Sequence, residues 1–253
     1  MLREEPAMGS VRFAIRLPED GLRFIEAEDL EGFFVGRYSF DDFGALLDSD
    51  DPEITFRLLE PSPPAFDADR LGDIEVLVLD ADGAVAGSYS FWGARVDTEF
   101  WRISARAQLP PHVEAGNLWR RPAPRRAGEW TNIPVGLREG WVEVAMLRDA
   151  AGPGPSKVAV PAGEVVLEGA HIEDVASFFC AVGEAFRGPG GYAGMGYTAL
   201  AEFLAAASSG QEIRLLWKDM EVAESIGGVD GETSPLEAMV RTFAEANVVV
   251  TPG

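Results

Sequence analysis

The sequence predicts an α/β protein in which a β-rich N-terminal domain precedes a C-terminal domain with a three-stranded parallel sheet and helices. Two observations carry this expectation. Extended runs rich in aromatic and β-branched residues recur through the first 150 residues. After residue 156, short apolar runs alternate with segments whose apolar residues recur at helical spacing. Strands that are separated by helices pair in parallel through crossover connections.

A segment rich in glycine and proline, DAAGPGPS at 149–156, separates these two parts. Its two glycines, two prolines and small residues sustain neither a helix nor a central strand. We therefore expect one domain at 1–150 and a second at 157–253.

The N-terminal part reads as an antiparallel sheet, arranged as a sandwich or an open barrel. Runs at 11–17, 22–27, 32–40 and 141–149 have the composition of strands. Residues 73–96 predict a hairpin, because Asp82-Gly83 favours a tight reversal between two extended runs. Residues 41–50 predict a short helix.

The C-terminal part changes to a helical rhythm. After a short strand at 165–167, apolar residues at helical spacing predict a helix that Gly188-Pro189 ends: Ile172, Val175, Phe178, Phe179, Val182 and Phe186. Glu173 and Asp174 would lie in its first turn, where the helix dipole favours acids. Further helices are expected at 198–208 and 235–246, with helix-compatible sequence at 218–225. Strands are expected at 213–217 and 248–251.

Three local patterns accompany this order of elements. They are Tyr-Ala-Gly-(two residues)-Tyr-Thr-Ala-Leu-(two residues)-Phe-Leu at 192–204, Trp217-Lys218 at the end of a strand, and Phe-x-Glu-Ala at 243–246 before the last strand. In order and spacing they resemble the barstar family of intracellular ribonuclease inhibitors, over residues 164–252. The resemblance implies a non-enzymatic inhibitor or immunity protein that blocks the basic active site of a microbial ribonuclease toxin.

The resemblance also implies which residues contact that partner. They belong to the loop before the second helix, to the exposed edge of that helix and to the end of the last helix: Tyr192, Gly194, Tyr197, Thr198, Ala201, Glu202 and Glu245. Thr198 stands where the family has an acid, and Gly196-Tyr197 where it has Asn-Leu. These departures bear on which target is bound. Glu245 also has a simpler interpretation, an i,i+4 pair with Arg241.

Helix geometry supports the assignment of the second helix. At 100° per residue, one face carries Ala199, Leu200, Phe203 and Leu204, and the opposite edge carries Thr198, Ala201, Glu202 and Ala205. Small residues on an exposed edge let a partner approach closely. The Glu202 carboxylate would take the place of an RNA phosphate and accept charge-assisted hydrogen bonds from Arg or Lys. A solvated acid on a helix face is the plain alternative for Glu202.

The charge composition limits the classes of partner that the chain is expected to bind. With 42 acidic and 21 basic residues the net charge is −21, which repels phosphate backbones and anionic membranes and attracts basic proteins. We expect neither a nucleic-acid nor a membrane partner. The N-terminus lacks the apolar core of a signal peptide, and the single cysteine, Cys180, forms no intramolecular disulfide. A cytoplasmic location is therefore expected, with Cys180 as a buried packing thiol.

No catalytic residue, metal site or cofactor is predicted. His112, His171 and Cys180 cannot make a structural zinc site without help from a carboxylate, and the glycine-rich loop at 188–196 lacks the Gly-Lys-Ser/Thr of a phosphate-binding loop. Two alternatives to the nuclease inhibitor remain open. One is a barstar-like interaction or regulatory module with a non-nuclease partner. The other is an enzyme whose site lies in the N-terminal domain and uses Asp41, Asp42 or Glu99.

Overall fold

The computed structural model of the 253-residue chain describes residues 12–18, 23–38, 52–62, 72–152, 164–208, 211–227 and 234–253. The chain forms two compact units. Unit 1 comprises Met1–Arg37 and Ser49–Pro122, and unit 2 comprises Tyr38–Asp48 and Ala123–Gly253. The division falls earlier in the chain than the Gly/Pro-rich segment at 149–156, because the residues just before that segment form a helix that packs within unit 2.

Unit 1 contains a seven-stranded sheet in the order β2-β1-β5-β6-β7-β4-β3, and each pair in it is antiparallel. The strands are β1 (Arg12–Arg16), β2 (Arg23–Ala27), β3 (Asp29–Glu31), β4 (Glu53–Leu59), β5 (Gly72–Leu79), β6 (Val85–Asp97) and β7 (Arg102–Arg106). The expected strands at 11–17 and 22–27 are confirmed as β1 and β2. The expected hairpin is confirmed as β5 and β6, with Gly83 at φ +78° in its turn.

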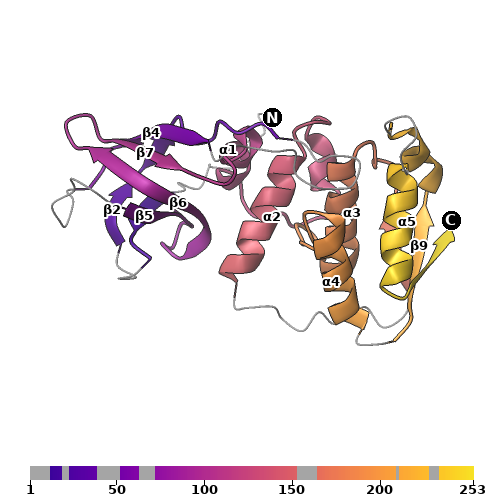
Figure 1. Cartoon of the computed structure of the whole chain (residues 1–253). Helices are drawn as coiled ribbons and strands as arrows, with labels where there is room; N and C mark the ends of the chain where they lie inside the picture. The colour runs from indigo at the N-terminus through magenta and orange to yellow at the C-terminus, as the bar shows by residue number, and fades with distance from the viewer. Residues whose placement is uncertain are drawn as a thin grey trace, which may run out of the picture. The chain divides into compact units, whose positions relative to one another are not determined.

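The two edges of this sheet meet. Strands β2 and β3 are its outermost strands, yet only Glu28 separates them in the chain. The Glu28 amide donates to the Leu59 carbonyl oxygen of β4, and the Ser62 amide donates to the Glu26 carbonyl oxygen of β2. The sheet must therefore roll into a barrel, visible as the indigo and magenta strands in Figure 1.

Two strand predictions are wrong, and for different reasons. Residues 32–38 form no strand, because Gly32 turns the chain at φ +78° and Phe33 enters the barrel as its core, with ring centroids 5.0 Å from Phe56 and 5.3 Å from Tyr89. Residues 141–149 belong to helix α2 (Glu139–Ala151). The helix expected at 41–50 lies outside the described residues.

Helix α1 (Val113–Trp119) of unit 1 begins at a buried histidine. His112 is its N-cap, and its Nδ1 accepts a hydrogen bond from the Glu114 amide at 3.2 Å. Burial first, and then the charge of Arg37, lower the pKa of His112 to about 4. The neutral imidazole is therefore the form that the fold selects.

This histidine makes the stability of unit 1 fall in mild acid. The folded pKa lies below the unfolded value of about 6.5, so the unfolded chain binds the extra proton as the pH falls from about 6.5 to about 4. We expect the chain to lose roughly 2 kcal/mol between pH 7 and pH 5 relative to a His112→Asn variant, which keeps a capping acceptor. Urea denaturation at both pH values measures the difference, with exposed His171→Asn as the control. Parallel pH profiles for the parent and His112→Asn would contradict this.

Unit 2 contains a three-stranded parallel sheet in the order β10-β9-β8, as the C-terminal pattern predicted. Its strands are β8 (Glu164–Glu168), β9 (Ile213–Lys218) and β10 (Val248–Pro252), and its helices include α3 (Val175–Arg187), α4 (Tyr197–Ser208) and α5 (Pro235–Glu245). Short 3₁₀ helices occupy Glu129–Asn132 (η1) and Met220–Ser225 (η2). Helix α3 begins later than predicted, because Asp174 is its N-cap and accepts from the Ser177 amide.

The strand order explains why one face of this sheet is open. The chain passes from β8 to β9 and then from β9 to β10, so both connections cross the sheet in the same direction. Because connections between parallel strands are right-handed, both of them place their helices on the same face of the sheet. The opposite face carries Val166 and Val249, which are 38% and 47% exposed. The covered face packs around Phe178 of α3, whose ring centroid lies 5.8 Å from both Trp217 of β9 and Phe243 of α5.

Helix α3 is the central helix of unit 2. It contacts β8, and α2 packs against it on the side away from α5 (Figure 1). Consequently even its small and polar residues are buried, including Ser177, Cys180 and Gly183. The expectation of a buried packing thiol at Cys180 is confirmed, and burial raises its pKa well above the ordinary value.

Candidate functional site

Helix α4 presents most of its predicted edge to solvent. Thr198, Glu202 and Ala205 are exposed, and Ala201 is half-buried. Leu200 and Leu204 are fully buried and Phe203 is partly buried, as predicted for the opposite face. Ala199 was placed on the buried face, and this is wrong: it is exposed, because the buried stripe continues from Leu204 to Ala207. The exposed surface of α4 is thus wider than predicted and is made almost entirely of small side chains around one acid.

The loop before α4 is closely packed on its own unit. Gly194 is buried at φ +140°, and a Cβ there would approach the Leu200 backbone nitrogen to 2.6 Å. Only glycine allows this contact with the first turn of α4. Tyr192 is half-buried, and burial, followed by the nearby Asp149, raises its pKa to about 12. Gly194 therefore shapes the loop, and Tyr192 offers part of its ring to solvent.

The two remaining predicted contacts lie in different surroundings. Tyr197 begins α4 and turns its ring onto α3, with centroids 5.6 Å from Phe179 and 6.2 Å from Phe178. Glu245 ends α5, which packs against α4. Its side chain is 66% exposed, and its Oε1 lies 3.9 Å from Arg241 Nε, in the i,i+4 arrangement considered above. Such a pair is worth only a few tenths of a kcal/mol, so it leaves Glu245 available to a partner.

A half-buried carboxylate that the sequence analysis missed holds the loop in place. Glu184 of α3 accepts hydrogen bonds from the Gly190 amide at 3.1 Å, the Gly128 amide at 2.6 Å and Trp130 Nε1 at 3.1 Å. Burial raises the pKa of Glu184, and these hydrogen bonds oppose that shift. Pro124 also touches this loop, since a Cβ on Gly190 would lie 2.9 Å from its Cγ. The segment that contains Pro124 and Trp130 therefore supports the loop before α4, which we call the recognition loop.

Glu184→Ala is expected to loosen that loop and to destabilise unit 2 by about 2 kcal/mol, because it leaves three donors without their acceptor. Hydrogen exchange at the Gly190 amide, followed by NMR, should accelerate at least tenfold. Urea denaturation gives the stability change. Glu224→Ala removes an exposed acid of η2 and serves as the control. Unchanged exchange at Gly190 would show that Glu184 does not hold the loop.

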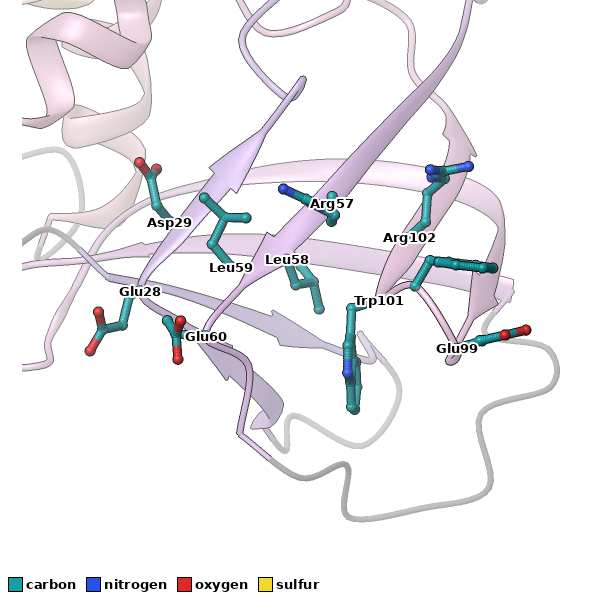
Figure 2. A pocket seen from close by; sticks show the side chains of 10 residues that line it. Glu28, Asp29, Arg57, Leu58, Leu59, Glu60, Glu99, Trp101 and Arg102 are labelled. Carbon is teal, nitrogen blue, oxygen red and sulfur yellow. The ribbon is translucent and has the colours of Figure 1, made fainter.

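Unit 1 carries a pocket of its own, with a volume of about 550 Å³. It lies where the β2–β3 connection, the end of β4 and the β6–β7 turn come together, and Figure 2 shows its lining. Trp101 projects between Glu28 and Glu60 on one side and Glu99 on the other. Glu99, considered above for an enzyme, therefore lines a pocket, but all three carboxylates are exposed. Asp41 and Asp42 lie outside the described residues.

Within the ranges that the structure describes, no group of three or more His, Cys, Asp or Glu residues is placed to hold a metal ion. The same ranges contain no helix that is both long and apolar enough to cross a membrane. No protein-family model, curated protein or solved structure matches the chain.

Proposed function

We propose that unit 2 binds the basic active site of a microbial ribonuclease and blocks it, as the barstar-like motifs imply. The single observation that carries the proposal is the exposed edge of α4, in which Glu202 is the one acid among small side chains. A helix of this kind approaches a concave surface closely, and its carboxylate accepts hydrogen bonds from the Arg and Lys side chains that grip RNA phosphates. The loop held by Glu184 borders this edge and is ordered before binding.

Charge supports the same proposal. Residues 156–253 hold 14 acids and 5 bases, so 14 minus 5 leaves a net charge of −9. A field of that sign attracts a basic nuclease from a distance and raises the association rate, most strongly at low ionic strength. Over residues 164–252 the order of strands and helices also agrees with the order that the resemblance implies.

Titration of the purified chain against a panel of basic secreted bacterial ribonucleases tests the proposal. Inhibition of at least one of them should saturate at one chain per nuclease. Raising the salt from about 50 mM to about 300 mM should weaken the inhibition about tenfold, because screening shortens the range of the field. If every nuclease in the panel stays fully active with the chain in excess, the proposal fails.

One observation favours a second candidate, an interaction module with a non-nuclease partner. The edge that faces outward holds Thr198 where the family has an acid, and Tyr197 faces α3. A surface with fewer charges suits a less basic partner. The chain with a photoactivatable cross-linker at Ala205, incubated in native lysate, distinguishes the two candidate functions. Capture of a nuclease through the α4 edge supports the first candidate, and capture of another protein supports the second.

A further inference from the structure

The outer surface of the unit 1 barrel carries four arginines on three neighbouring strands. Arg57 of β4 lies directly opposite Arg102 of β7, and Arg95 of β6 lies opposite Ser104 of β7. Arg106 of β7 lies opposite Trp92 of β6. All four arginines are exposed and Trp92 is half-exposed, so these side chains share one face. We call it the arginine face: Trp92, Arg57, Arg95, Arg102 and Arg106.

Acids also lie on this face, in a chain that has two acids for every base: Glu31 is opposite Arg57, Asp97 is opposite Arg102 and Glu53 is opposite Arg106. Arg57 pairs with Glu31 at 2.7 Å, and Asp97 uses its Oδ1 to accept from the Glu99 amide. Among the described residues, Arg95, Arg102 and Arg106 form no ion pair. Like charges directly opposite each other destabilise a sheet, and Glu31 and Asp97 on the outer sides of Arg57 and Arg102 offset part of that repulsion. A bound anion would relieve it.

The pocket of unit 1 opens at one end of the arginine face. Arg57 and Arg102 lie side by side there, with Trp101 below them (Figure 2). Phe100 is 52% exposed, and the Arg102 guanidinium lies 5.9 Å from its ring centroid. Glu60 and Trp101 adopt left-handed backbone conformations, with φ of 49° and 52°. Such strain in non-glycine residues persists where a site requires the resulting side-chain positions.

The geometry points to single-stranded nucleic acid as the ligand of this face. The arginines that form no ion pair with a described residue are available to phosphates, and the exposed ring of Phe100 and the half-exposed ring of Trp92 offer planes on which bases stack. The pocket beyond Phe100 is large enough for one nucleobase, and the carboxylates of Glu28, Glu60 and Glu99 accept hydrogen bonds from base amino groups. The side chains that would bind phosphates and those that would bind bases thus lie at separate places on the surface. A simple polyanion would use only the first set, so the arrangement favours a nucleic acid.

The net charge of −21 opposes such binding over long distances. It does not decide the outcome at contact, since charges are screened beyond about 10 Å at 0.1 M salt and the arginine face is local. The expected complex is therefore weak, with a Kd on the order of 10 μM at about 50 mM salt. This site lies in unit 1 and does not depend on the inhibitory role proposed for unit 2.

Fluorescence anisotropy of a labelled single-stranded RNA of about ten nucleotides, titrated with the full chain, tests the inference. Three phosphate contacts predict a slope of about −2 for log affinity against log salt. The double variant Arg95→Ser/Arg106→Ser should weaken binding at least tenfold and bring the slope to about −0.7. Phe100→Ala should weaken binding about tenfold with little change of slope, because stacking involves no counterion. All three side chains are exposed, so the variants fold.

Arg12→Ser is the matched control, because Arg12 is an exposed arginine of the same barrel on β1, and it should leave the affinity within twofold. Equal losses for Arg12→Ser and the double variant would overturn the inference, as would the absence of binding at low salt. Inorganic polyphosphate provides the other decisive arm. If polyphosphate displaced the RNA when both were present at the same concentration of negative charges, the proposed recognition of bases would be overturned.

Discussion

Glu202→Lys is expected to weaken inhibition of a basic ribonuclease by about a hundredfold or more. Glu202 is the only acid of α4, and it is exposed on the edge proposed for contact. Removing one partner of a desolvated charge pair at an interface costs about 2–5 kcal/mol, and the new ammonium adds repulsion. Lysine and glutamate have similar helix propensities, so the helix keeps its stability. The inhibition constant of each variant against the nuclease that responds in the panel measures the effect.

A matched variant separates contact from long-range attraction. Glu224→Lys changes the net charge by the same amount on η2, and it should alter the affinity by no more than about threefold through the weaker field. Thr198→Asp should act in the opposite direction and strengthen inhibition, because it places an acid on the same edge. It also lies in the first turn of α4, where the helix dipole favours a negative charge. Equal effects of Glu202→Lys and Glu224→Lys would mean that the α4 edge is not the contact surface.

Unit 2 was predictable because its local signals agree with one another. Each strand is a short apolar run, and the last helix begins with a capping box between Ser234 and Glu237 and with Pro235 in its first turn. Three strands with helices between them allow few topologies, so the parallel sheet follows from the pattern. The resemblance pointed to Glu202, and helical periodicity independently placed it on the exposed edge of α4.

Helix α2 was not predictable by the same reasoning, because its acids face inward. Glu139 and Glu143 are buried, and the Tyr38 hydroxyl donates a hydrogen bond to Glu143. When acids are assigned to the solvent face, Val142-Glu143-Val144 reads as the alternation of a strand. Burial and the nearby Glu143 raise the pKa of Tyr38, so its hydroxyl remains the donor. Which partner satisfies a buried acid is tertiary information, absent from local pattern.

The arginine face and the Glu184 contacts were missed for a related reason. Arg57, Arg95, Arg102 and Arg106 are spread over fifty residues of sequence among more numerous acids, and only strand register brings them together. The strands β4 and β7 that carry three of them were not predicted. Likewise, Glu184 meets Gly128 and Trp130 across more than fifty positions. An isolated acid in a helix gives no sign of such partners.

Arg138→Met is expected to destabilise unit 2 by about 3 kcal/mol. Arg138 precedes α2 and is 3% exposed. Its guanidinium donates to the Ile133 carbonyl oxygen at 3.2 Å, the His171 carbonyl oxygen at 3.0 Å and Ser177 Oγ at 2.6 Å. It also lies 5.1 Å from the Trp130 ring centroid. Methionine fills much of the volume but leaves buried acceptors unsatisfied, which costs about 1–3 kcal/mol for each one that water cannot reach.

Urea denaturation of Arg138→Met, followed by the fluorescence of the unit 2 tryptophans, measures this change. Arg214→Met provides the control, because the Arg214 side chain is 75% exposed and its ion pair spans 3.7 Å, so the change should stay within about 0.5 kcal/mol. Arg138→Lys should recover only part of the loss, since an ammonium cannot donate in the planar fork that reaches three acceptors and stacks on Trp130. If Arg138→Met matched Arg214→Met, the segment from Trp130 to α2 would not be an integral part of unit 2. The conclusion that this segment supports the recognition loop through Glu184 would then fail as well.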